Sequence, residues 1–174
     1  LYKAAKEAGH ECCIAYGRGK APEGFNTIKI GNQLDTYLHV LKARVFDASG
    51  FGSKHSTKKF IKEIEKFKPD IIHLHNIHGY YVNIEILFKY LKEHPEIKKI
   101  WTLHDCWAFT GHCAYYTYAK CDKWKAGCQG HCLNKNEYPK TIFSRINKNY
   151  LRKKELFNDI DNMILVTPSK WLKG

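Results

Sequence analysis

The chain has 174 residues and a formal net charge of +12, and 44% of its residues are hydrophobic. This composition excludes a disordered chain, and no apolar stretch reaches the roughly 20 residues of a membrane-spanning helix. The charge suits nucleic acid, an anionic membrane surface or phosphorylated small molecules as partners, and it equally suits a lysine-rich surface that serves solubility alone.

The first part of the chain predicts short strands and amphipathic helices. A helix over residues 1–8 is ended by Gly9, and strands are expected over residues 11–16 and 27–30. The helix expected over residues 34–46 has four apolar side chains at helical spacing, which should face the core: Leu34, Leu38, Leu41 and Val45. In the next helix, one apolar face is formed by Phe60, Ile61, Ile64 and Phe67.

The second part continues the alternation of strands and helices. Pro69 prevents the preceding helix from continuing, and a strand over residues 68–76 follows. Asn83 is expected to cap a helix that ends before Pro95, with an inner face formed by Ile84, Leu87, Phe88 and Leu91. The remaining segments are a strand, a long stretch rich in Cys, Gly, Tyr and Trp, a basic helix, a strand and a short helix, over residues 97–105, 106–139, 142–153, 162–166 and 169–174. This rhythm predicts βαβ units and an α/β fold with a parallel sheet and flanking helices.

The loop at residues 17–20 (Gly-Arg-Gly-Lys) follows an expected strand. It lacks the spacing of a Walker phosphate-binding loop and the Ser or Thr after the lysine, and it does not fit the dinucleotide fingerprint. We interpret it as an ordinary loop, although its backbone amides and its two cationic side chains could still bind an anion.

Two of the expected strands end in a histidine followed by Asn or Asp. Because ligands bind at the carboxyl ends of strands in open α/β folds, this pattern predicts a site. Alternation places His73 and His75 on the same side of their strand. They could bind a metal, but the segment has no carboxylate to complete such a site. We interpret His73 as a core histidine bonded to the backbone, and His75, Asn76 and His78 as candidates for substrate contacts.

The second of these strands is closed by His104 and Asp105. A histidine at this place can exchange a proton near neutral pH and can bind a sugar hydroxyl in either tautomer. His104 is therefore the leading catalytic candidate. Three roles stay open for Asp105, which could orient His104, bond a hydroxyl or cap the next turn.

Seven cysteines without a signal peptide predict a reducing compartment, where metal binding or burial is more frequent than disulfides. Four of them lie close together in the sequence, at Cys113, Cys121, Cys128 and Cys132. Their spacing lacks the paired C-x2-C knuckles of most structural zinc sites. Four thiolates could still close a tetrahedral zinc site, and the alternatives are two disulfides or four free thiols.

Several motifs together resemble the N-terminal half of a family 4 glycosyltransferase with the GT-B architecture. Residues 1–16 are similar to that family's first helix and second strand. Further strand and domain-end motifs of the family resemble residues 68–76 (KPDIIHLHN), 99–105 (KIWTLHD) and 165–173 (LVTPSKWLK). The stretch 102–113, the later cysteines and residues 135–139 (KNEYP) resemble a subgroup of bacterial polysaccharide-assembly transferases.

The resemblance implies a Rossmann-like domain and a transferase that moves a sugar from a nucleotide-sugar donor to an acceptor hydroxyl with retention, in polysaccharide or glycolipid assembly. It implies that His104, with Asp105 beside it, acts near the reacting centre of the donor sugar. It also implies that a single loop lines the acceptor side, which adds two residues to the candidates named above: His75, Asn76, His78, Gly79 and Tyr80. Such enzymes generally need no catalytic metal.

Relative to that family, residues 1–174 correspond to the acceptor-side domain, with the Cys-rich segment 106–139 as an insertion. The family's first strand with its glycine-rich loop is absent, and so is its C-terminal donor domain. We therefore expect this piece alone to bind donors poorly and to turn over nothing.

The resemblance also suggests a partner for the positive charge. Family members that work on lipid-linked acceptors often sit on the inner membrane face through a basic N-terminal domain. We expect a cytoplasmic protein whose basic helix could contact anionic lipid, with a solvated helix face as the alternative. The inner face of that helix should be formed by Ile142, Phe143, Ile146 and Tyr150, and its outer face by Arg145, Lys148, Arg152 and Lys153.

The alternative function is a basic zinc-containing module that binds nucleic acid. Its metal site would be the cysteine cluster, and four aromatic side chains would stack on bases: Tyr115, Tyr116, Tyr118 and Trp124. The α/β pattern around the cysteines and the scarcity of arginine oppose this function, so no nucleic-acid partner is expected. A thiol redox protein is opposed by the absence of any C-x-x-C motif.

Overall fold

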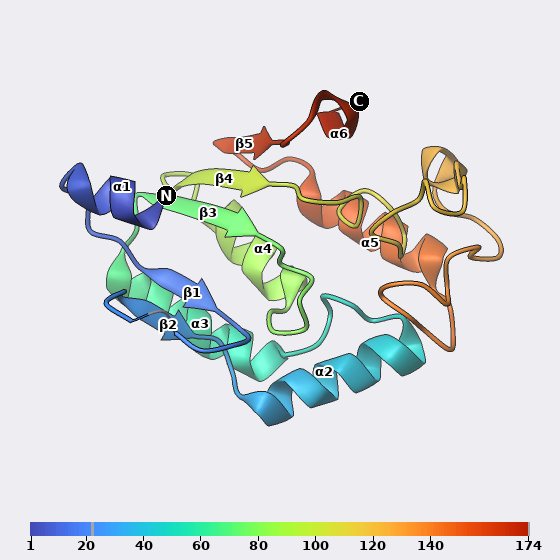
Figure 1. The fold of residues 1–174 in the computed structure, drawn as a ribbon, viewed down its shortest axis with the longest axis horizontal. Helices are drawn as coiled ribbons and strands as arrows, with labels where there is room; N and C mark the ends of the chain where they lie inside the picture. Colours follow the sequence, from blue (N-terminus) through green and yellow to red (C-terminus); the bar gives the residue numbers. More distant parts are fainter. Residues whose placement is uncertain (22, 174) are drawn as a thin grey trace.

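The computed structural model describes residues 1–21 and 23–173, so Pro22 in the loop after the first strand and Gly174 at the end of the last expected helix lie outside the described residues. Helices and strands are interspersed along the chain, and the helices lie beside the strands, as is typical of an α/β fold (Figure 1). The order of elements is α1 (Tyr2–Glu7), β1 (Ile14–Tyr16), β2 (Thr27–Lys29), α2 (Gln33–Phe46), α3 (Lys54–Phe67), β3 (Ile71–His75), α4 (Ile84–Glu93), β4 (Lys98–Thr102), the 3-10 helix η1 (Lys123–Ala126), α5 (Ile146–Phe157), β5 (Met163–Val166) and α6 (Lys170–Lys173).

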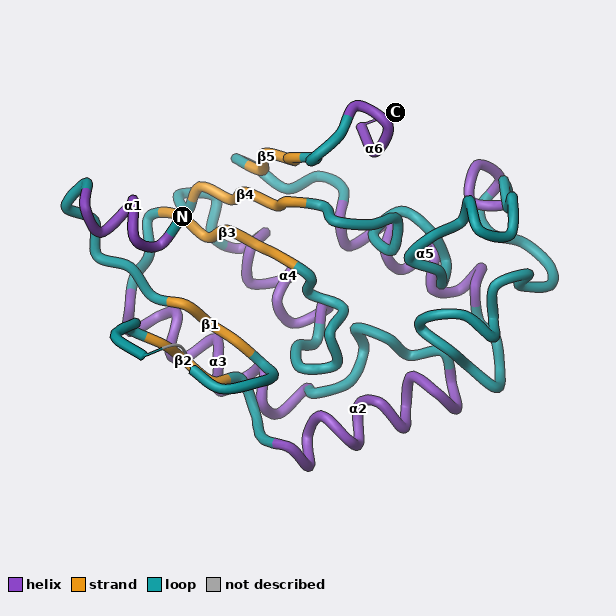
Figure 2. Tube along the Cα trace, in the orientation of Figure 1, coloured by secondary structure: helices purple, strands orange, loops and turns teal. Residues whose placement is uncertain are grey.

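The strands form two parallel sheets. β1 pairs with β2, and β4 lies between β3 and β5 in a sheet of three strands. The predicted α/β class, with parallel strands and flanking helices in a Rossmann-like arrangement, is confirmed, although the described strands are divided between two sheets. All strand arrows point the same way in Figure 1, and long loops gather beyond their carboxyl ends in Figure 2. That end of the molecule is where a ligand site is expected.

The core lies between the three-stranded sheet and the helices α3, α4 and α5. α4 packs between the other two helices and buries the four side chains predicted for its inner face: Ile84, Leu87, Phe88 and Leu91. The Phe88 ring lies 5.3 Å from the Trp101 ring of β4 and 4.5 Å from the Phe157 ring of α5, measured between centroids. Burying one such side chain contributes about 1.5–3 kcal/mol, so this cluster fixes the sheet on its helices.

The ends of α4 follow the sequence. The side-chain oxygen of Asn83 accepts the N–H of Ile86 at 3.1 Å, as an N-cap does, and the helix ends at Glu93, before Pro95. In α3 the predicted apolar face is confirmed for three of its four side chains: Ile64 is buried, Phe60 and Ile61 pack against the core, and Phe67 is half-buried outside that cluster.

The orientation predicted for α2 is wrong. The apolar stripe expected to face the core is largely exposed, since Leu34, Leu38 and Leu41 keep 65%, 55% and 59% of their surface and only Val45 is half-buried. α2 buries His39 and Ala43 instead. The reason is a set of hydrogen bonds that turns the polar side inward.

His39 is the centre of these bonds. Its Nε2 accepts the backbone N–H of Gly50 at 3.2 Å and of Gly52 at 3.1 Å, and its Nδ1 lies 2.9 Å from Ser53 Oγ. These partners assign the neutral ring with the proton on Nδ1. Gly52 permits the close approach, because a Cβ at this position would lie 2.4 Å from the ring. The loop after α2 is thereby fixed to the helix.

Acid is expected to destabilise the protein through His39. Burial lowers the pKa of this ring to about 4, below the ordinary value of about 6.5 that it has in the unfolded chain. Because the unfolded state takes up the proton first, stability is complete above about pH 6.5 and decreases as the pH falls towards 4, by at most about 3 kcal/mol. Urea unfolding between pH 7.5 and 4.5 measures the decrease. The dependence should flatten in His39→Gln, and an unchanged slope in that variant would contradict the assignment.

A buried polar network joins α2 to α5. Asp47, which ends α2 with a φ of 54°, binds His112 Nδ1 through Oδ1 at 2.6 Å and accepts the N–H of Arg145 through Oδ2 at 2.8 Å. Its carbonyl accepts Asn149 Nδ2 at 2.6 Å. Lys153 is 2% exposed and donates to the carbonyl of Trp107. Burial lowers the pKa of Lys153 to about 7, while the charge of Asp47 acts in the opposite direction.

This network corrects the face assignment for the basic helix. Lys153 lies inside the protein, and Arg152 is half-buried against Glu85 and the ring of Phe51. Ile142 and Phe143, expected inside, precede α5 and are exposed. Helical spacing alone cannot show that Lys153 will bond to a backbone carbonyl in the interior, as it does to that of Trp107. Of the four cations predicted to contact anionic lipid, only Arg145 and Lys148 therefore lie on the exposed face.

Candidate active site

The carboxyl ends of β3 and β4 bring the two leading histidines together. His75 closes β3, and His104 follows the last residue of β4 by two positions. His75 Nδ1 and His104 Nε2 lie 3.0 Å apart, so that one ring donates to the other. Both side chains are exposed to solvent. A pair of histidines that faces solvent at this edge can bind sugar hydroxyls and exchange protons with them.

His73 lies beside this pair and not in the core, contrary to the prediction. Its ring centroid is 4.1 Å from that of His75, on the same side of β3 as predicted, and its Nε2 lies 2.8 Å from Thr102 Oγ1, a side-chain partner rather than a backbone one. The helices cover the other side of β3, where Leu74 is buried. Burial lowers the pKa of His73 and of His75, and the charge of His104 lowers both further. These two rings are therefore neutral at pH 7.

Asp105 does not bond to His104. Its Oδ2 lies 2.8 Å from His78 Nε2, and its Oδ1 accepts the N–H of Trp107 at 2.9 Å. Of the three roles left open, capping the next turn is the one observed, and the bond to His78 was not foreseen. Burial lowers the pKa of His78, Asp105 raises it, and Lys153 lowers it. The sequence marked both residues of this pair, but their spacing could not show that they meet.

The loop after β3 is held in a fixed shape beside these pairs. Asn76 is exposed and adopts a φ of 41°, its carbonyl accepts the N–H of Gly79 at 3.3 Å, and Tyr80, with a φ of 63°, is buried. The hydroxyl of Tyr81 donates to the carbonyl of Asn76 at 3.3 Å. Gly17, at the end of β1, lies against Tyr81, because a Cβ at Gly17 would overlap the tyrosine ring at 2.0 Å. These contacts hold the predicted acceptor loop against the end of β1.

Sequence reasoning missed Tyr138 as a site residue. This tyrosine belongs to the segment that precedes α5, and its hydroxyl lies 3.5 Å from His78 Nδ1. Its ring centroid lies 6.2 Å from that of Tyr80. Its only sequence signal was the KNEYP motif. Tyr138 brings the long Cys-rich stretch into contact with the histidines, across 60 residues of sequence.

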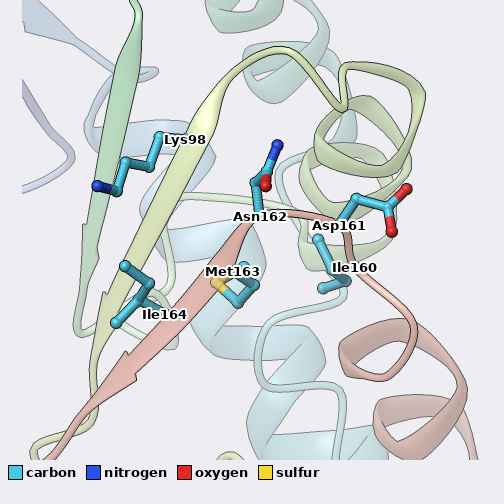
Figure 3. Close-up of a pocket in the computed structure, with 6 residues that line it drawn as sticks. All are labelled: Lys98, Ile160, Asp161, Asn162, Met163 and Ile164. Carbon is cyan, nitrogen blue, oxygen red and sulfur yellow. The ribbon is translucent and has the colours of Figure 1, made fainter.

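Two cavities lie at opposite ends of the strands. A cavity of about 410 Å³ lies beside Tyr138, and its lining is formed by Arg18, Val40, Arg44, Tyr80, Asn136, Glu137, Tyr138 and Lys140. A second cavity of about 570 Å³ lies at the amino ends of β4 and β5, between Lys98 and residues 160–164 (Figure 3). Because the histidines lie at the carboxyl ends, the cavity of Figure 3 is remote from them and is not the candidate active site.

The four candidate zinc ligands are free cysteines in the structure. Cys113, Cys128 and Cys132 are buried and Cys121 is half-buried. Burial raises the pKa of Cys132 to about 11, and the charges of Cys113 and Cys121 raise it further, so this thiol is protonated at pH 7. Within residues 1–21 and 23–173, no group of three or more His, Cys, Asp or Glu side chains is arranged to hold a metal ion. Zinc binding by this cluster stays a prediction.

The aromatic side chains suggested for nucleic-acid stacking are only partly free. Tyr116 and Trp124 pack against each other, with ring centroids 5.3 Å apart, and both contact Phe109. Tyr115 and Tyr118 are exposed. A stacking surface needs several open rings in a row, and this arrangement does not supply one.

The fold and the histidines define an α/β protein with a polar site at the carboxyl ends of parallel strands. The chain is 28% identical over 171 residues to a protein of Escherichia coli (strain K12) named "Putative colanic acid biosynthesis glycosyl transferase WcaC". The match covers 92% of this chain and 41% of that protein, so the chain spans about two fifths of its relative's length. No protein-family model and no solved structure matches the chain. None of the helices in its described part is both long enough and apolar enough to cross a membrane.

Proposed function

We propose that the chain is the acceptor-side domain of a glycosyltransferase in polysaccharide assembly. The similarity to the Escherichia coli relative over 92% of the chain carries this proposal. The site supports it, because His75 and His104 meet at the carboxyl ends of β3 and β4, 3.0 Å apart and open to solvent. A site of polar rings that is open to solvent suits a sugar better than a hydrophobic substrate.

The reaction proposed is transfer from a nucleotide sugar with retention, in an enzyme of the GT-B architecture. The bond from the anomeric carbon to the donor's phosphate oxygen breaks and its electron pair goes to that oxygen, a bond to the acceptor oxygen forms, and the acceptor hydroxyl passes its proton to the departing phosphate. His104 contacts the donor sugar near the anomeric carbon, where positive charge develops as in other glycosyl transfers. The bonded pair of His78 and Asp105 holds the acceptor side, together with the loop around Asn76.

The donor nucleotide is proposed to bind a further domain, as the relative extends well beyond the matched part. On this proposal the 174 residues alone bind donors poorly and turn over nothing. No metal cofactor is assigned to the transfer step.

The test is sugar transfer by the full-length protein. A panel of radiolabelled nucleotide sugars is offered with membranes of the source organism as acceptor, with and without EDTA, and labelled lipid and polysaccharide are counted. Transfer from at least one donor that survives EDTA is the expected result. A folded full-length protein that transfers label from none of the donors would sink the proposal.

A further inference from the structure

Three positive side chains converge on the 410 Å³ cavity from separate parts of the chain. Arg18 comes from the loop after β1, Arg44 from α2, and Lys140 from the segment before α5. None of the three forms a salt bridge with another described residue. One carboxylate, Glu137, also lines the cavity. The cations outnumber it, so the cavity has a net positive lining.

The walls of this cavity add neutral donors. Tyr80 and Tyr138 both line it. Burial raises the pKa of both hydroxyls, while the charge of Arg18, which lines the same cavity, acts on each in the opposite direction. A protonated phenol is a hydrogen-bond donor. The cavity therefore combines guanidinium, ammonium and hydroxyl donors around one space.

The cavity adjoins the candidate active site at Tyr138. This residue lines the cavity, and its hydroxyl lies 3.5 Å from His78 Nδ1, while His78 Nε2 lies 2.8 Å from Asp105. A ligand group in the cavity would thus lie next to a molecule at the strand ends. The spacing suits one ligand that carries a charged group beside its reacting hydroxyl.

We propose that this cavity is a subsite for an oxyanion, a phosphate or a carboxylate, carried by the acceptor. Arginine forks match both groups in bidentate geometry, and the cavity supplies two of them. Assigning the oxyanion to the acceptor rests on the proposed glycosyltransferase function, whereas the binding of an oxyanion does not. The loop at residues 17–20, which lacks a Walker motif, supplies one of the cations.

Calorimetric titration tests the subsite with two probes, methyl phosphate and the methyl glycoside of a uronic acid, at fixed ionic strength. The test variant is Arg18→Ala/Arg44→Ala. The matched control is Lys20→Ala/Lys42→Ala, which removes the same charge from the same loop and helix but lies outside the lining. All four side chains are exposed, so both variants should fold, and thermal unfolding verifies it. Lys140→Ala is the fallback if the test variant is unstable.

At least one probe should bind the unaltered protein. Its affinity for the test variant should be about tenfold or more lower, and its affinity for the control should stay within about twofold. The probe that binds more tightly identifies the oxyanion. Binding of neither probe, or equal weakening in both double variants, overturns the subsite. The two proposals can fail independently. If a probe binds but no sugar is transferred, the oxyanion subsite stands and its assignment to an acceptor is wrong. If sugar is transferred but no probe binds, the proposed function stands and the subsite is wrong.

Discussion

Replacing Asp47 with alanine is expected to lower the free energy of unfolding by about 3–5 kcal/mol, the cost of leaving a buried charge without its partner. Asp47 is 2% exposed, and its side chain binds His112 and the N–H of Arg145. Its charge also counteracts the burial of Lys153. One substitution therefore removes a counter-charge and leaves His112 and the N–H of Arg145 without a hydrogen-bond partner at the junction of α2 and α5.

Urea unfolding at pH 6.5, below the pKa of about 7 of Lys153, measures this loss. Asp122→Ala is the control, because Asp122 is exposed and pairs with Lys125 at 3.0 Å on the surface, where such pairs contribute about 0–1 kcal/mol. A loss below about 1 kcal/mol in Asp47→Ala would show that the network does not hold the two helices together.

If the proposed sugar transfer is its activity, His104→Ala in the full-length protein is expected to reduce turnover by about 100-fold or more while the fold stays intact. Removing a positioned proton-transfer or polar group at a reacting centre typically costs 10²–10⁴-fold. The ring of His104 is exposed and bonds only to His75 among the described residues, so its truncation leaves the core untouched.

Sugar transfer and the thermal midpoint of unfolding are measured side by side for this variant. His55→Ala is the control, since His55 is also exposed but belongs to α3. Sugar transfer by the variant at close to the rate of the unaltered protein would show that His104 has no role at the reacting centre.

The elements with a single strong local signal could be predicted from the sequence. Asn83 and Pro95 bound α4 because a cap and a proline act on the neighbouring backbone alone. The histidines meet at one edge because parallel strands align their carboxyl ends, which the alternation of strands and helices already implied.

What could not be predicted depends on partners distant in sequence. The inward side of α2 is set by His39 and the N–H groups of a loop more than ten residues away, and no periodicity in α2 records them. Lys153 lies inside the protein, where it donates to the carbonyl of Trp107 across 46 residues, and Tyr138 reaches His78 across 60. Such contacts outweigh local pattern, since an unpaired buried charge costs more than an exposed leucine.

The outward stripe of α2 has a consequence for how molecules of this protein behave toward one another in solution. Leu34, Leu38 and Leu41 present an adhesive surface, and the net charge of +12 opposes contact between copies by mutual repulsion. The range of that repulsion shrinks from about 30 Å at 0.01 M salt to about 3 Å at 1 M. Added salt therefore screens the charge repulsion but leaves the attraction between the exposed leucines. We expect the protein to self-associate at high salt and to stay dispersed in dilute buffer.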